Sequence, residues 1–204
     1  ESDSQLDAIL AQTRSLRVGL PTDATMPQIG PLISTAAAEQ LKQTYDDLVS
    51  RRCEPLVPWQ TDSRRANLVY PAIVDATHCS DEDLNAIGAL EWFGPLLVIQ
   101  HVRDFESALR AAANTPYGLA AALLGGSAAM FETFVDRVGA GVVNWNGPTT
   151  GAAGNLPFGG LGDSGNHRPA GFHAIDFCSD PVASLQTDSQ SETLQQVDLW
   201  NVAK

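Results

Sequence analysis

Apolar residues recur at helical spacing in some parts of the chain and form short unbroken runs in others. The helical spacing predicts two long amphipathic helices, over residues 4–16 and 34–51. Shorter helices are predicted over residues 81–87, 104–114 and 127–138. Short apolar runs predict strands over residues 67–74, 96–102, 119–124 and 141–145. The middle of the chain therefore alternates between strand and helix.

This alternation is typical of an α/β fold in which helices connect parallel strands. Ligands in such folds bind at the carboxyl ends of the strands. Residues 146–165 follow a predicted strand and are rich in Gly, Pro, Thr, Ser and Asn, and a loop of this length usually has a function. Residues 181–185 predict a short terminal strand before a polar tail. We therefore divide the chain into residues 1–180 and 181–204.

Composition excludes several classes of function. The 204 residues include 12 Lys and Arg against 24 Asp and Glu, a net charge of −12 that repels nucleic acid. No apolar run approaches the ~20 residues of a membrane-spanning helix, so no membrane partner is expected. Three separated cysteines favour a reducing compartment, and hence a cytoplasmic location, over a disulfide framework. Scattered histidines and the lack of a C-x-x-C pair predict no metal site.

The segment Glu91-Trp92-Phe93-Gly94-Pro95 places a carboxylate two residues before an aromatic ring. In extended backbone, the side chains of Glu91 and Phe93 point to the same side. A carboxylate can accept hydrogen bonds from both hydroxyls of a ribose, and an adjacent ring can pack on a flat heterocycle. The alternative is a solvated loop carboxylate beside a core phenylalanine.

Two further segments contain groups suited to ligand binding. Asn144-Trp145-Asn146 follows a predicted strand, where its amides could bind a ligand or simply cap a turn. Residues 157–165 contain a G-x-G-x-x-G pattern, but too little chain follows for a dinucleotide-binding unit. We expect these glycines to let backbone pass close to another group.

The three cysteines are candidate nucleophiles, although a free cysteine is more often an inert buried thiol. Cys53 follows two arginines but lies at the end of a predicted helix, where the helix dipole disfavours a thiolate. Cys79 precedes a run of acidic residues, and Cys178 lies near the end of the chain. None of the three is therefore expected to be catalytic.

Taken together, the motifs resemble the C-terminal signature of the aldehyde dehydrogenase superfamily. The matching motifs are E-x-F-G-P at residues 91–95, N-W-N at 144–146 and P-F-G-G-x-G-x-S-G at 157–165. The resemblance extends from about residue 4 to about residue 185. It implies an α/β fold, the three-layer parallel sheet with flanking helices of the family's catalytic domain, N-terminally incomplete. The residues around the last two motifs look most like the succinylglutamate-semialdehyde dehydrogenases of arginine breakdown.

The resemblance implies a role for each candidate residue. Glu91 matches the carboxylate that holds the hydroxyls of the nicotinamide-side ribose, and Phe93 matches the ring that packs near the nicotinamide. The loop from Asn146 to Phe158 matches the segment that anchors the aldehyde, with Phe158 on its wall. The candidates for contact with a polar, acidic substrate are Asn146, Thr149, Thr150, Gly151 and Phe158.

The resemblance also implies groups outside the chain. The family uses NAD or NADP, a cysteine nucleophile, an oxyanion-stabilising asparagine and a general-base glutamate. These residues and the cofactor-binding domain are expected before Glu1, so the chain contains no catalytic residue and is expected to be inactive alone. The full-length enzyme is expected to be a homo-oligomer that oxidises a small aldehyde. The alternative is a non-catalytic binding or assembly module derived from the same fold.

Overall fold

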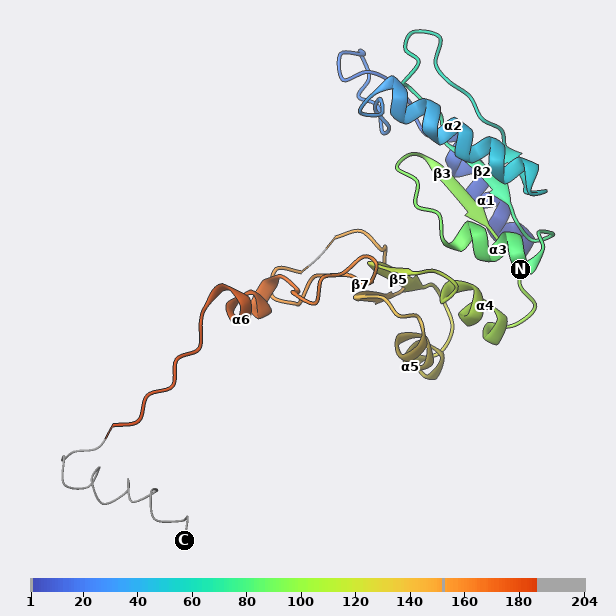
Figure 1. Cartoon of the computed structure of the whole chain (residues 1–204). Coiled ribbons are helices and arrows are strands. Elements are labelled where there is room, and N and C mark those ends of the chain that lie inside the picture. The colour runs from blue at the N-terminus through green and yellow to red at the C-terminus, as the bar shows by residue number, and fades with distance from the viewer. Residues whose placement is uncertain (1, 152, 187–204) are drawn as a thin grey trace.

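The computed structural model describes residues 2–151 and 153–186, and its elements form two neighbouring groups (Figure 1). The helices are α1 (Ser2–Ser15), α2 (Thr35–Ser50), α3 (Asp81–Gly88), α4 (Phe105–Ala112), α5 (Ala128–Arg137), the 3-10 helix η1 (Gly171–His173) and α6 (Ala174–Cys178). The strands are β1 (Glu54–Val57), β2 (Ala72–Asp75), β3 (Leu96–Ile99), β4 (Tyr117–Gly118), β5 (Ala120–Leu123), β6 (Val142–Trp145) and β7 (Leu161–Gly162).

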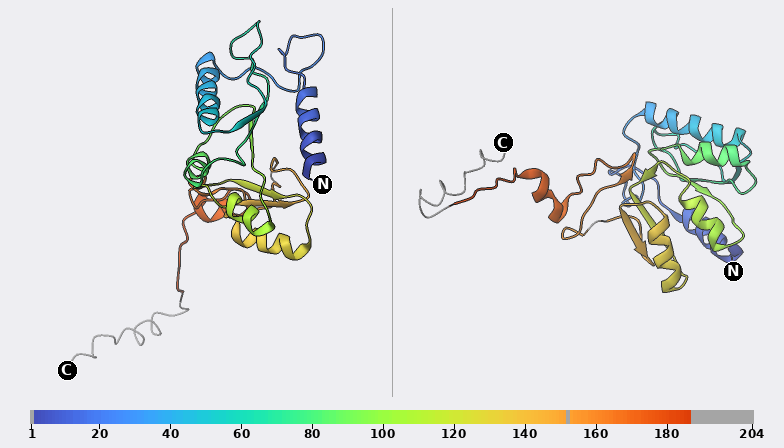
Figure 2. Two further views of the ribbon diagram at one scale, coloured as in Figure 1. Left: turned by 90° about the vertical axis from the view of Figure 1, so that its right-hand side faces the viewer. Right: turned by 60° about the horizontal axis from the view of Figure 1, so that its bottom comes forward.

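The first group is a three-stranded sheet in the order β1-β2-β3, with β2 and β3 parallel and β1 antiparallel to β2. Helices α1 and α2 lie on opposite faces of this sheet (Figure 2). Apolar residues at helical spacing on α2, including Leu41 and Leu48, pack against Val74 and Leu96 of the sheet. Because Leu48 and Val74 are fully buried, this cluster is the core of the first group.

The second group contains the parallel pair β5-β6 and the antiparallel pair β4-β7. Leu109 of α4 and Phe134 of α5 are buried and pack against Ala121 of β5 and Val143 of β6. This second core is separate from the first. Residues 179–186, which follow α6, extend away from both groups (Figure 1).

The predicted α/β fold with parallel strands is confirmed, although the described strands form three small sheets. Two predicted helix starts are also confirmed, because the side chain of Ser34 accepts from the Ala37 N–H and that of Asp104 from the Ser107 N–H. The sequence does not predict strand β1 (Glu54–Val57), because the segment is short and contains Pro55. Proline is tolerated there because β1 lies at the edge of its sheet.

The end of the chain differs from the sequence prediction. Residues 181–185 do not form the predicted terminal strand, because no described strand lies beside them to complete a ladder. Val182 and Leu185 are instead extended and exposed, with 88% and 102% relative exposure. Residues 187–204 lie outside the described residues, so the division into residues 1–180 and 181–204 stays a prediction.

Candidate functional site

The turn between α3 and β3 presents the two predicted cofactor-binding residues. Trp92 in this turn points inward, packs against the first core and donates a hydrogen bond from Nε1 to the Leu96 carbonyl, 2.8 Å away. A Cβ added to Gly94 would overlap the side chain of Leu41 on α2. A larger residue at this position would require the Leu41 side chain to move, so the turn lies in close contact with α2. Trp92 and Gly94 together fix the position of the turn.

Glu91 and Phe93, on either side of Trp92, are exposed. The Phe93 ring is 79% exposed, so it does not belong to the core of the described residues. Both residues line a cavity of about 220 Å³ that is also bounded by Gln40 and Thr44 of α2. The structure therefore brings the carboxylate and the ring together on one surface. The sequence does not predict that Gln40 and Thr44 line this cavity, because no local spacing relates them to residue 91.

Glu91 also borders a second cavity of about 250 Å³, on the side of the second group. Tyr117, Gly118 and Ser164 line this cavity with it. Within residues 2–151 and 153–186, the Glu91 carboxylate has no hydrogen-bond or ion-pair partner. Its oxygens are thus available to accept hydrogen bonds from a ligand.

The Asn146 side chain binds a backbone group of a neighbouring loop. It has a left-handed φ of 53°, and its Oδ1 accepts a hydrogen bond of 2.6 Å from the Gly125 N–H. The Trp145 indole donates to the Gly125 carbonyl and stacks on Phe131 with 5.4 Å between ring centroids. These contacts join the end of β6 to the loop after β5. The geometry of Asn146 therefore matches the turn-capping alternative more closely than a free substrate ligand.

The other predicted substrate residues are separated from one another. Thr149, Thr150 and Gly151 are exposed and do not line the cavities beside Glu91, and Ala152 lies outside the described residues. Phe158 is 42% exposed and pairs with Ala170 through antiparallel backbone hydrogen bonds. The structure therefore does not gather the five substrate candidates around a single cavity.

Phe158 lines a cavity of about 400 Å³. Asp163 and Arg168 line the same cavity and carry opposite charges. Ser164 lines this cavity and also the second cavity beside Glu91. Its hydroxyl accepts a hydrogen bond of 3.2 Å from the Gly118 N–H. Ser164 thus lies between the Phe158 cavity and the second Glu91 cavity. Neither sequence motif alone predicts that these two cavities share a residue.

The glycine-rich segment packs closely against other backbone, as expected. A Cβ on Gly141 would overlap the Gly159 carbonyl, and a Cβ on Gly165 would overlap the Gly160 carbonyl. No long helix follows this segment within the described residues, where only η1 and the short α6 come after it. The segment is therefore a tightly folded loop with no dinucleotide-binding helix behind it.

Neither Cys53 nor Cys178 is placed to attack an aldehyde beside Glu91. Cys53 is 2% exposed, and burial, followed by its hydrogen bond with Cys79, raises the pKa of its thiol to about 12. A thiol with this pKa remains protonated at neutral pH, and the thiolate is the reactive form. Cys178 is exposed at the end of α6 and lines none of the cavities beside Glu91 or Phe158.

Over residues 2–151 and 153–186, no three His, Cys, Asp or Glu side chains gather into a group that could hold a metal ion. No helix in the described part of the chain combines the length and the apolar character needed to cross a membrane.

Comparison with known proteins finds one family. The model of the aldehyde dehydrogenase family matches residues 2–182. A protein named N-succinylglutamate 5-semialdehyde dehydrogenase from Chromohalobacter salexigens is 41% identical over 187 residues, 92% of this chain and 37% of that protein. The protein of the same name from a Caulobacter species is 39% identical over 194 residues, 94% of this chain and 38% of its own length. The chain thus spans less than two fifths of these relatives.

Solved structures show the same similarity. The crystal structure of HpcC from Thermus thermophilus matches 90% of this chain with a TM-score of 0.74 and 27% identity. Glyceraldehyde-3-phosphate dehydrogenase GapN from Methanocaldococcus jannaschii, solved in complex with NADP, matches 87% with a TM-score of 0.75 and 26% identity. The chain covers 38% and 37% of these two chains.

Proposed function

The chain belongs to the aldehyde dehydrogenase family, and we propose that it carries the nicotinamide-facing wall of an NAD(P)-dependent aldehyde oxidation site. The observation that carries this proposal is the outward-facing pair Glu91 and Phe93 on a turn anchored by Trp92 and Gly94. A bound nicotinamide cofactor would supply the acceptor for the hydride that leaves the aldehyde.

In this proposal, Glu91 positions the cofactor. Its carboxylate has no partner in the described part of the chain and can accept hydrogen bonds from two ribose hydroxyls. The exposed Phe93 ring offers an apolar face for a flat heterocycle and excludes water from it. Both residues sit on a turn with a packed core behind it, so little conformational freedom is lost when a ligand binds.

We propose that the nucleophile is not one of the three cysteines of this chain. The family mechanism requires a thiolate that forms a thiohemiacetal with the aldehyde. Cys53 is buried and burial raises the pKa of its thiol, and no cysteine lines either of the two cavities beside Glu91. Since the chain spans 37% and 38% of two relatives, we assign the nucleophile, the oxyanion asparagine, the general base and the dinucleotide-binding domain to protein outside these 204 residues.

The proposed substrate is an acidic semialdehyde such as N-succinylglutamate semialdehyde, which would place the protein in arginine catabolism. The names of the relatives support this class of substrate. The hydroxyls of Thr149 and Thr150 are exposed and have no partner among the residues that the structure describes. They can therefore donate to a substrate carboxylate. Phe158, which lines a different cavity, would contribute an apolar surface.

The proposed enzyme is a cytoplasmic homo-oligomer, an expectation that rests on the free cysteines and on the extended segment after α6. Val182 and Leu185 in that segment are exposed and form no ladder with another described strand. An extended, apolar segment of this kind is suited to pairing with the sheet of a second copy. Light scattering that finds only monomers of the complete protein at high concentration would contradict this assembly.

Reduced nicotinamide formation tests the proposed function. The complete protein that contains this chain should oxidise N-succinylglutamate semialdehyde with NAD or NADP, and the purified 204-residue chain should not. Turnover by the 204-residue chain would overturn the assignment of the nucleophile. Failure of the complete protein to oxidise any semialdehyde would favour the non-catalytic module.

A further inference from the structure

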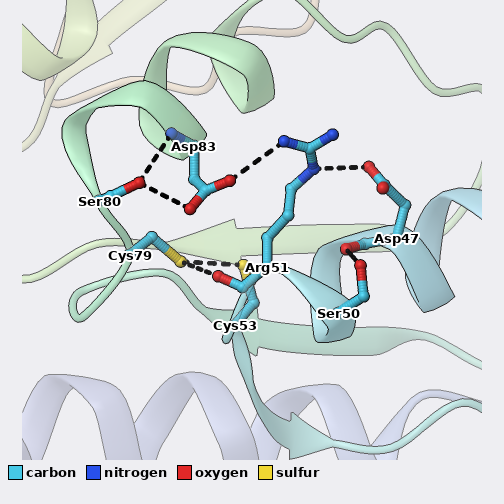
Figure 3. Close-up of polar contacts among 7 residues, drawn as sticks. All are labelled: Asp47, Ser50, Arg51, Cys53, Cys79, Ser80 and Asp83. Atoms are coloured by element: carbon cyan, nitrogen blue, oxygen red, sulfur yellow. Dashed lines mark hydrogen bonds and ion pairs between the residues drawn. The ribbon is translucent and has the colours of Figure 1, made fainter.

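Two cysteines that lie 26 residues apart in the chain are in contact in the structure. Cys53 immediately precedes β1, and Cys79 lies in the turn between β2 and α3. Their Sγ atoms are 3.4 Å apart, and both thiols are free (Figure 3). The pair lies away from the Glu91 turn, and the proposed aldehyde oxidation does not use it.

A network of polar contacts holds the two cysteines together. The Cys79 thiol donates to the backbone carbonyl of Arg51, with 3.2 Å from Sγ to oxygen. The Arg51 guanidinium binds Asp47 on α2 at 2.8 Å and Asp83 on α3 at 3.1 Å. Figure 3 shows Arg51 reaching between these two carboxylates. The end of α2 is thereby attached to the start of α3, with the two sulfur atoms between them.

The two thiols differ in their accessibility. Cys53 is 2% exposed, whereas Cys79 is only partly buried. A small reagent therefore reaches Cys79 first. Burial also raises the pKa of the Cys53 thiol, so Cys53 is the poorer initial nucleophile. This arrangement of one reachable thiol in contact with a second, shielded thiol is typical of redox-responsive pairs.

We propose that Cys53 and Cys79 form an oxidation-responsive pair that closes to an intramolecular disulfide when a small disulfide such as oxidised glutathione is present. Cys79 attacks one sulfur of the oxidant, which forms a mixed disulfide and releases one glutathione thiol. The Cys53 sulfur then attacks the Cys79 sulfur and displaces the second glutathione, whose departing thiolate takes the Cys53 proton. Two protein thiols are oxidised, one glutathione disulfide is reduced, and the two protons end on the two glutathione thiols.

Closure requires only a local movement. The separation of the sulfur atoms must shorten from 3.4 Å to the covalent distance of about 2.0 Å. The resulting link encloses β1 and β2 in a covalent loop. It restricts the unfolded chain more than the folded chain, so the oxidised protein is the more stable form.

The test uses the purified 204-residue chain with Cys178→Ser, which leaves Cys53 and Cys79 as its two thiols. After incubation with oxidised glutathione, trypsin digestion should yield a peptide of residues 53–64 joined to one of residues 66–103. The melting temperature should rise by roughly 5–10 °C, and dithiothreitol should reverse both changes. Non-reducing electrophoresis should show no new cross-linked species between chains.

A second variant, Cys53→Ser, tests the order in which the two thiols react. In Cys53→Ser, glutathione should remain attached to Cys79 as a stable mixed disulfide, because no second thiol displaces it. The proposal is overturned if the Cys178→Ser protein keeps both thiols free, retains glutathione on Cys79, or forms only links between chains.

Discussion

Substitution of Gly141 by alanine tests how the glycine-rich segment is held against the second group. Gly141 lies directly before β6, and its N–H donates to the Gly118 carbonyl at 2.9 Å. An added Cβ would overlap the Gly159 carbonyl oxygen and lie 2.9 Å from the Gly159 carbonyl carbon. These are backbone atoms, which cannot rotate away as a side chain can. Gly141 does not have a positive φ, so the perturbation is steric.

The expected magnitude follows from the cost of inserting a methyl group into a packed region. Such overpacking costs about 1–3 kcal/mol. For a chain of 204 residues, each kcal/mol lowers the melting temperature by about 2–4 °C. Gly141→Ala should therefore melt roughly 2–12 °C below the unmodified protein. The segment that carries Phe158 should shift with Gly159.

Thermal denaturation followed by circular dichroism measures this effect. The matched control is Gly154→Ala, because a Cβ at Gly154 meets no atom within 4 Å and its φ is not positive. The control should melt within about 1–2 °C of the unmodified protein. If the two variants melt at the same temperature, the close approach of Gly141 to Gly159 is not a constraint on the fold.

Three further predictions concern the cores, the acid stability and the site. Leu48→Ala and Leu109→Ala remove side chains that are 0% and 1% exposed, so denaturant unfolding should show losses of about 2–5 kcal/mol each, additive in the double variant because the cores are separate. Hydrogen bonds from Arg64 lower the pKa of Asp62 to about 2 from its ordinary 3.8, so the stability from this pair is complete above 3.8 and lost as the pH falls towards 2. Asp62→Asn should flatten that part of the pH profile of unfolding, whereas an unchanged profile would contradict the pairing. Phe93→Ala should leave the melting temperature nearly unchanged, because the ring is 79% exposed, but should weaken cofactor binding in the complete protein.

Elements determined by local pattern were predicted from the sequence. The spacing of Leu41 and Leu48 and the cap at Ser34 specify α2 without reference to the rest of the chain. The pairing of Tyr117 with Gly162 was not predicted, because it depends on contact between distant residues and each strand has only two residues. The edge strand β1 was missed for a similar reason, since its pattern is weak and its partner β2 defines it.

In the candidate site, too, residues that are neighbours in the sequence could be predicted, and residues from distant elements could not. Alternation about Trp92 correctly places Glu91 and Phe93 on one exposed surface. The contributions of Gln40 and Ser164 come from elements far away in the chain, so no spacing could indicate them. The roles of these residues in binding remain predictions.

In the proposed function, the free carboxylate of Glu91 binds the cofactor. The most direct test is the KM for NAD or NADP of the complete protein with Glu91→Gln, compared with Glu82→Gln on the exposed surface of α3. Loss of hydrogen bonds to a charged group costs about 1.5–3 kcal/mol, so Glu91→Gln should raise the cofactor KM by roughly 10–150-fold. Glu82→Gln should leave this KM unchanged. Equal cofactor KM values for the two variants would show that the Glu91 carboxylate does not bind the cofactor.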